Sequence, residues 1–213
     1  MALIKIQKMI AVIDNSYSNL KSITNALSFL NISHVVIKAG DIADNHSHLI
    51  IPGVGNFSTV MNDLKKNKED TKIINFFKLK KPIMGICLGM QILSSLGDES
   101  GPTSGLNLIP GSVKKMHSLE NEYLPHIGWN SVKILKNHPV LNEIKNEMDF
   151  YFVHSYKFNL ENANHALGET FYCENFNSIV TKDNVIGFQF HPEKSQKYGL
   201  KIFQNFCNWD GSC

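Results

Sequence analysis

Short apolar runs and amphipathic stretches alternate along the first half of the chain. Four runs rich in Ile, Val and Met are bounded by polar residues, as buried strands are, and we expect strands at 9–14, 34–38, 48–51 and 82–86. Three stretches between them carry apolar residues at helical spacing, which predicts helices at 20–30, 56–64 and 71–79. This strand–helix–strand alternation predicts an α/β fold with a doubly wound, largely parallel central sheet.

The second half of the chain has a different pattern. Seven short strand-like runs are separated by turn residues: 112–116, 123–127, 131–135, 150–153, 166–171, 178–181 and 185–190. They predict hairpins, so we expect antiparallel additions to the sheet in this half. A last helix is expected over 196–207, with Leu200, Phe203 and Phe206 on its buried side.

Neither an internal repeat nor a low-complexity linker interrupts the sequence. A chain of 213 residues is long enough for one domain with a sizeable core. We therefore expect a single domain over residues 9–209, preceded by a leader or extended start at 1–8 and followed by a tail at 210–213. Residues 1–8 lack the long apolar segment of a signal peptide, and the longest uncharged stretch, 82–97, is too short to span a bilayer.

Composition argues against several classes of partner. The net charge of +2, from 21 basic and 19 acidic residues, gives no electrostatic reason to expect binding to nucleic acid or to a membrane. The four cysteines form no C-x-x-C pair and are too sparse for a disulfide framework, which favours a cytoplasmic location. No cysteine or carboxylate cluster accompanies the closely spaced His46 and His48, so we expect no metal site.

The candidate chemistry begins at Cys87, where the fourth predicted strand ends. Gly85 and Gly89 flank it at two residues on each side, which is the spacing of a nucleophile elbow with Cys in place of Ser. Glycine gives the room that a tight strand-to-helix turn needs, and the free N–H groups and dipole of a helix N-terminus favour a thiolate. By itself, the pattern is also compatible with an inert cysteine in the core.

A base for this nucleophile is available in His191-Pro192-Glu193. The residue before a proline is extended, and residues i and i+2 of an extended segment point to the same side. Glu193 can therefore hold one ring nitrogen of His191 while the other nitrogen faces Cys87, as a thiol nucleophile requires. A lone H-P-E could equally be a solvated loop after a strand.

Five segments carry a resemblance to a known family: Pro52-Gly53-Val54-Gly55, Gly85-Ile86-Cys87-Leu88-Gly89-Met90-Gln91, Pro125-His126-Ile127-Gly128-Trp129-Asn130, Tyr151-Phe152-Val153-His154-Ser155-Tyr156 and Gln189-Phe190-His191-Pro192-Glu193-Lys194-Ser195. With them the chain resembles the class I (triad-type) glutamine amidotransferases, and more closely the glutaminase subunits of imidazole glycerol phosphate synthases. The elbow and H-P-E are shared by the whole class, whereas the third and fourth segments are typical of this subunit. The match runs from about residue 9 to about residue 206.

The resemblance implies a complete site around a catalytic Cys87, His191 and Glu193. It also implies oxyanion donors from the backbone at Gly53, Val54 or Gly55 and at Leu88, and contacts to L-glutamine from Gln91, Ser155 and Tyr156. Taken alone, the segment 52–55 could be a plain turn, and Gln91 could be a helix residue hydrogen-bonded to a neighbouring loop. The aromatic segment 151–156 could belong to the core.

A protein partner is expected near Trp129 and Asn130, which follow a glycine in an expected turn. An exposed Trp in that place suits a protein interface. The resemblance implies that the partner is a cyclase subunit with a (β/α)8 barrel fold, that the two chains form a heterodimer, and that Asn15 and Lys194 also face the partner.

The resemblance implies hydrolysis of L-glutamine to L-glutamate and ammonia without a cofactor. The ammonia would pass to the cyclase, which makes imidazole glycerol phosphate and the aminoimidazole carboxamide ribotide AICAR in histidine biosynthesis. The family usually has D-Y-G-x-G-N-L at 14–20, and here Ser16 and Ser18 replace both glycines. This departure motivates an alternative, a paralogous glutaminase that feeds a related synthase amidating a surface-polysaccharide sugar. Two further alternatives are not amidotransferases in function: a regulator without catalytic activity and a plain binding module. The intact triad argues against a loss of catalytic activity.

Overall fold

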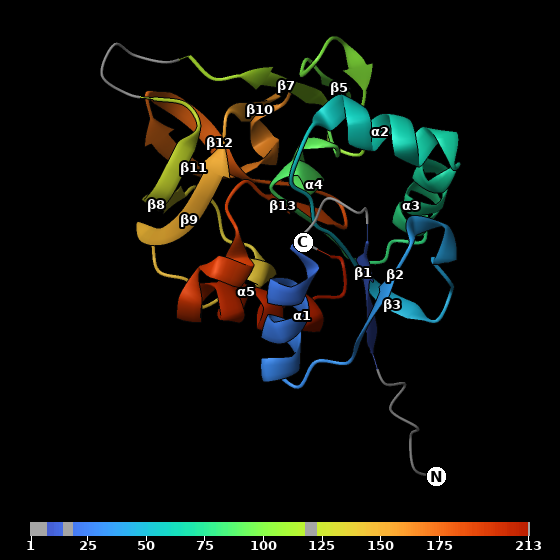
Figure 1. Ribbon diagram of the computed structural model, residues 1–213. Helices are drawn as coiled ribbons and strands as arrows, with labels where there is room; N and C mark the ends of the chain where they lie inside the picture. Colours follow the sequence, from blue (N-terminus) through green and yellow to red (C-terminus); the bar gives the residue numbers. More distant parts are fainter. Residues whose placement is uncertain (1–7, 15–18, 118–122, 213) are drawn as a thin grey trace.

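The computed structural model describes residues 8–14, 19–117 and 123–212, and a nine-stranded mixed sheet organises them (Figure 1). Its strand order is β2-β1-β3-β4-β13-β12-β11-β8-β9. The first five strands in this order run parallel: β2 (His34–Ile37), β1 (Met9–Ile13), β3 (His46–Ile51), β4 (Ile83–Ile86) and β13 (Val185–Phe188). The other four continue the sheet through antiparallel pairs: β12 (Glu174–Lys182), β11 (Ala166–Tyr172), β8 (His126–Ile134) and β9 (Met148–His154).

A smaller sheet has the order β10-β7-β5-β6. Its strands are β10 (Tyr156–Leu160), β7 (Gly111–Lys115), β5 (Leu96–Gly97) and β6 (Thr103–Ser104). The side chain of Asn177 in β12 donates a hydrogen bond to the Phe158 carbonyl in β10 at 3.0 Å, which ties the two sheets together. Four single 3₁₀ turns lie in the described part of the chain: η1 (Ala39–Asp41), η2 (Pro139–Leu141), η3 (Ala163–His165) and η4 (Pro192–Lys194).

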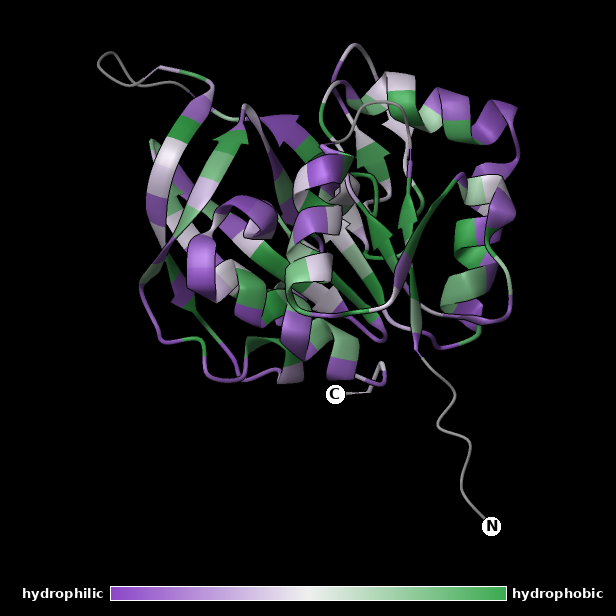
Figure 2. Cartoon of the chain, turned by 60° about the horizontal axis from the view of Figure 1, so that its bottom comes forward, coloured by the Kyte–Doolittle hydropathy of each residue, from purple (hydrophilic) through white to green (hydrophobic). Residues whose placement is uncertain are grey.

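Helices cover both faces of the parallel strands, because alternate residues of a strand point to opposite sides. Ile10 and Val12 of β1 are buried in one cluster with α1 (Leu20–Phe29) and α5 (Gln196–Asn208). Ala11 and Ile13 are buried in a second cluster with α2 (Phe57–Lys66) and α3 (Glu69–Lys78). Figure 2 shows apolar residues gathered along the strands and on the inner sides of the helices.

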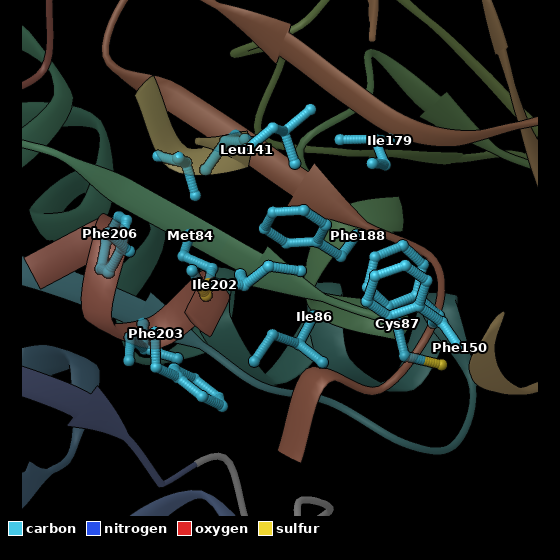
Figure 3. Close-up of a cluster of buried hydrophobic side chains, with 14 of the residues drawn as sticks. Met84, Ile86, Cys87, Leu141, Phe150, Ile179, Phe188, Ile202, Phe203 and Phe206 are labelled. Carbon is cyan, nitrogen blue, oxygen red and sulfur yellow. The ribbon is translucent and has the colours of Figure 1, made fainter. Parts of the chain in front are cut away.

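The cluster beneath α5 extends along β4 and β13 to the carboxyl ends of these strands. Figure 3 shows Phe203 from α5 on one side of it and Phe188 from β13 further along. Cys87 lies at the edge of this cluster, with its sulfur pointing away from the aromatic rings (Figure 3). This cluster therefore ends where the short helix α4 (Leu88–Gln91) begins, and Leu88 and Met90 of α4 are buried in the second cluster.

The expected fold class is confirmed, since a doubly wound parallel core carries antiparallel additions from the second half of the chain. Several details of the expectation are wrong. The strand expected over 178–181 is part of the much longer β12, and β10 was not expected at all. The strand expected over 48–51 begins two residues earlier in β3, at His46, which is buried.

The turn expected at Trp129 and Asn130 is also wrong. Both residues lie inside β8, which runs without a break from His126 to Ile134 and joins the two strands expected over 123–127 and 131–135. β8 pairs with β9 over its whole first part, from His126 opposite His154 to Val132 opposite Met148. This pairing continues before and after Gly128, so the glycine does not end the strand.

Candidate active site

Cys87 forms the sharp turn between β4 and α4, with φ +54° and ψ −112°. A positive φ is rare for a residue with a side chain and is typical of a nucleophile elbow. The two flanking glycines are required by space. A Cβ at Gly89 would lie 1.7 Å from the carbonyl oxygen of Ile51, and one at Gly85 would lie 2.6 Å from that of Gly89.

His191 and Glu193 reach the same place because β13 is the parallel neighbour of β4. The Cys87 N–H donates to the Phe188 carbonyl at 2.7 Å, and the chain then continues from β13 into η4. His191 Nδ1 and Glu193 Oε1 are 2.7 Å apart, and their side chains are only 3% and 2% exposed. Nε2 of His191 is buried without a conventional hydrogen-bond partner among the described residues, and it is the ring nitrogen left for the Cys87 sulfur.

The His191 imidazole has a raised pKa. Burial alone would lower the pKa of this ring, but the interactions with Cys87 and then with Glu193 outweigh burial and raise it to about 10. The ring is therefore held in its charged form beside the sulfur. An imidazolium between a sulfur and a carboxylate can give a proton to a leaving group, which is what acyl transfer by a thiol requires.

A cavity of about 250 Å³ opens beside the sulfur. It is lined by Val54, Gly55, Cys87, Leu88, Gln91, Glu99, Pro125, Val153, His154, Ser155 and Tyr156. Most of the substrate and oxyanion residues expected from the sequence therefore meet at one cavity, although they come from three separate segments of the chain. Such a concave site with few polar groups suits a small ligand.

The sequence profile of the family described as "Glutamine amidotransferase class-I" matches residues 11–209. The chain belongs to the class-I glutamine amidotransferase family. The resemblance drawn from the sequence motifs is thereby confirmed.

Curated relatives within this family carry one recurrent name. The chain is 43% identical over 198 residues to the imidazole glycerol phosphate synthase subunit HisH of Methanocaldococcus jannaschii, covering 93% of this chain and 98% of that protein. It is 38% identical over 204 residues to the subunit of the same name from Sulfurimonas denitrificans, covering 94% and 98%.

Two solved structures share the fold at low sequence identity. PurLQS from Thermotoga maritima superposes with a TM-score of 0.75 at 18% identity, covering 95% of this chain and 98% of that one. A glutamine amidotransferase from the same organism superposes with a TM-score of 0.66 at 16% identity, covering 95% and 83%. These likenesses concern the fold alone.

The oxyanion donors expected from the family are only partly in position. The Leu88 N–H donates to the Gly53 carbonyl at 3.2 Å, so this amide is already engaged within the protein. Val54 is half-exposed at the cavity, and Gly55 has φ +109°, which a residue with a side chain rarely adopts. Rotation of a peptide in this segment would free the Leu88 amide, and the two-donor oxyanion site stays a prediction.

Gln91 is expected to contact substrate, and its amide has a defined orientation. Nε2 donates to the Tyr156 carbonyl and to Gln189 Oε1, both at 3.1 Å. Both N–H groups are thus used within the protein, and a contact to the substrate falls to Oε1. Gln91 is therefore hydrogen-bonded to a neighbouring segment of the chain, and it also lines the cavity.

Glu99 is a cavity residue that the sequence analysis missed. Its Oε2 accepts a hydrogen bond from the Phe57 N–H, the first amide of α2, at 2.7 Å. Burial first, and then the charges of Glu99 and Asp98, raise the pKa of the Tyr156 hydroxyl. The signal for Glu99 in the sequence was the adjacent pair Asp98-Glu99, and such a pair is equally common in a solvated loop.

Of the residues expected at a partner interface, Trp129 and Lys194 lie on one surface, around the Tyr151 ring. Trp129 is 48% exposed and packs edge-on to Tyr151, with ring centroids 6.0 Å apart. Lys194 Nζ lies 5.3 Å from the centre of the Tyr151 ring. Asn130 faces differently, since its Nδ2 donates to the Phe171 carbonyl at 2.9 Å. Asn15 lies outside the described residues.

Within the described ranges, no group of three His, Cys, Asp or Glu side chains is placed to hold a metal ion. His48 Nε2 instead lies 2.9 Å from the Trp209 carbonyl. No helix in the described part of the chain is both long and apolar enough to cross a membrane.

We expect the charge states of two histidines at the site to differ in solution. His191 should keep both ring protons through neutral pH and lose one only as the pH rises towards about 10. His154 should stay neutral, because burial lowers its pKa to about 3. Ring ¹⁵N shifts followed by NMR across this range report both groups. In Cys87→Ala the His191 transition should move to lower pH, and a wild-type His191 that titrated near the ordinary value of about 6.5 would contradict the ion pair.

Proposed function

We propose that this chain is the glutaminase subunit of an imidazole glycerol phosphate synthase. It hydrolyses L-glutamine and passes the ammonia to a cyclase subunit. The observation that carries the proposal is the strained Cys87 beside the buried His191–Glu193 pair, at the mouth of a small cavity. Relatives with 34–43% identity over nearly the whole chain bear the name of this synthase subunit, which supports the assignment.

The chemistry follows from the three side chains. The Cys87 thiolate attacks the carboxamide carbon of glutamine, and backbone amides hold the resulting oxyanion. The C–N bond breaks as His191 gives its proton to the nitrogen, which leaves as ammonia. Neutral His191 then takes a proton from water, and the hydroxide displaces the thiolate from the γ-glutamyl thioester. Glu193 holds the imidazole in orientation and stabilises its cation throughout.

The cavity suggests how the rest of the substrate is held. The α-ammonium group of glutamine needs acceptors, and Glu99 and Oε1 of Gln91 supply them on one side of the cavity. Ser155 and Tyr156 line the same cavity, where they would hold the α-carboxylate. This assignment leaves the carboxamide end of the substrate to point at the sulfur.

The partner is proposed to cover the outer face of β8 and β9. Val153 lines the cavity and pairs with Ile127, and Tyr151 pairs with Trp129 on the same two strands. The cavity wall thus continues directly into the exposed Trp129 surface, where a (β/α)8 cyclase subunit would receive ammonia before it meets bulk water. The sparse cysteines favour a cytoplasmic location for such a complex.

Genetic complementation tests the destination of the ammonia. Co-expressed with the cyclase subunit of its own source, this chain should restore growth of a histidine auxotroph that lacks both subunits. His191→Ala in the same plasmid is the matched control and should not support growth in low ammonium. An active glutaminase that failed to restore growth would instead favour the polysaccharide paralogue, which the names of the relatives do not favour.

A further inference from the structure

Besides His191, a second buried polar side chain contacts the Cys87 sulfur. Gln189 lies directly after β13 and is 0% exposed. Its backbone N–H donates to the Ser178 carbonyl at 2.9 Å, and its side-chain Nε2 lies 3.8 Å from Cys87 Sγ, within hydrogen-bond distance for sulfur. An amide buried this completely is costly unless its polar atoms are satisfied, so its position next to the nucleophile needs an explanation.

The orientation of this amide follows from the network itself. A backbone carbonyl can only accept, so the Tyr156 carbonyl requires the nitrogen of Gln91 to face it. The second N–H of that nitrogen then requires an acceptor, so Gln189 must present Oε1 to Gln91. The nitrogen of Gln189 is therefore left to face the sulfur. His154 Nδ1 lies 2.9 Å from the same Tyr156 carbonyl and helps to hold the start of the network in place.

We infer that Gln189 is a catalytic residue that stabilises the Cys87 thiolate by donating an N–H to it, and that Gln91 fixes the polarity of this donor. The inference rests on the proposed function, since it concerns the nucleophile of that reaction. Hydrogen bonds to charged groups are stronger than those between neutral groups, so the donor favours the thiolate over the thiol. The same donor strengthens the sulfur as a leaving group when the thioester is hydrolysed.

A second contact of the sulfur favours the neutral thiol. Sγ lies 3.7 Å from the Val153 carbonyl, which can accept a hydrogen bond from a thiol but repels a thiolate. Gln189 and His191 can both donate to the thiolate. Other titratable side chains around the sulfur are Glu193 behind the imidazole, His154 and, across the cavity, Glu99 and Tyr156.

Alkylation of Cys87 by iodoacetamide tests this inference without any turnover of glutamine. The rate is measured against pH, and modification at Cys87 is read by peptide mass spectrometry. In Gln189→Met, which keeps the length of the side chain but removes the donor, the midpoint of the profile should move up by about 1 pH unit or more. Gln189→Asn, which withdraws the donor by one methylene, should shift it in the same direction. Exposed Gln204→Met is the matched control and should leave the profile unchanged.

Turnover gives an independent readout. Because Gln189 contacts the sulfur and not the substrate, Gln189→Met should lower kcat by about 10-fold or more with little change in KM. Circular dichroism and thermal unfolding identify which of the two variants is folded. A folded variant whose alkylation profile matches the wild type overturns the inference. Glutamate release that survives Cys87→Ala would instead overturn the proposed function and leave the alkylation result standing.

Discussion

Cys87→Ala is expected to abolish glutamate release, with kcat lower by roughly 10⁴-fold or more, since removal of a nucleophile costs about as much as removal of the whole triad. The substitution keeps a Cβ at the strained φ of +54°, so the elbow backbone carries the same strain with and without the sulfur. The loss should therefore be chemical and not structural. Glutamate release by the complex with the cyclase subunit, with and without the nucleotide ligand of that subunit, measures it.

Cys173 offers a matched control for this experiment. It is also a buried cysteine, and it also has a positive φ, of +58°. Cys173→Ala should retain kcat within about twofold, because the residue lies away from the cavity in the turn between β11 and β12. Comparable loss in both variants would indicate a general effect of cysteine removal and would count against the assigned role of Cys87.

The parallel half of the fold could be predicted from sequence because its apolar runs are continuous and each is followed by a helix or a tight turn. The antiparallel half could not be predicted to the same detail. Gly128 suggested a turn inside β8, but seven register pairs with β9 hold that strand together, and a single sequence does not reveal pairing between distant strands. β10 was missed because it is a strand through its pairing with β7 in the second sheet, and that pairing is not visible in the sequence.

The site shows the same division between local pattern and distant contact. The elbow glycines and H-P-E could be found because spacing along the chain encodes their geometry. Glu99 and Gln189 could not be assigned, because their roles depend on cavity walls and amide polarity that arise from distant segments. The engaged Leu88 amide was equally beyond sequence, since it depends on where the Gly53 carbonyl comes to lie.

Gly89→Ala is expected to destabilise the fold by about 3 kcal/mol or more and to inactivate the enzyme. The added Cβ would lie 1.7 Å from the Ile51 carbonyl oxygen, and backbone on both sides prevents relief by a change of rotamer. Ile51 ends β3, immediately before Pro52 and the expected oxyanion segment. The overlap would therefore push the elbow helix away from the segment that must supply an oxyanion donor.

Urea unfolding measures the first part of this expectation, with a lower midpoint at an unchanged slope. Gly40→Ala is the matched control, because the nearest atom to its added Cβ is a carboxylate oxygen of Glu69 at 3.7 Å, an ordinary contact. That variant should stay within about 0.5 kcal/mol of the wild type. The two substitutions add the same methyl group, so a difference between their unfolding midpoints reports the space available at each site. If Gly89→Ala unfolded at the wild-type midpoint and released glutamate normally, β3 and the elbow could not approach as closely as the active-site geometry requires.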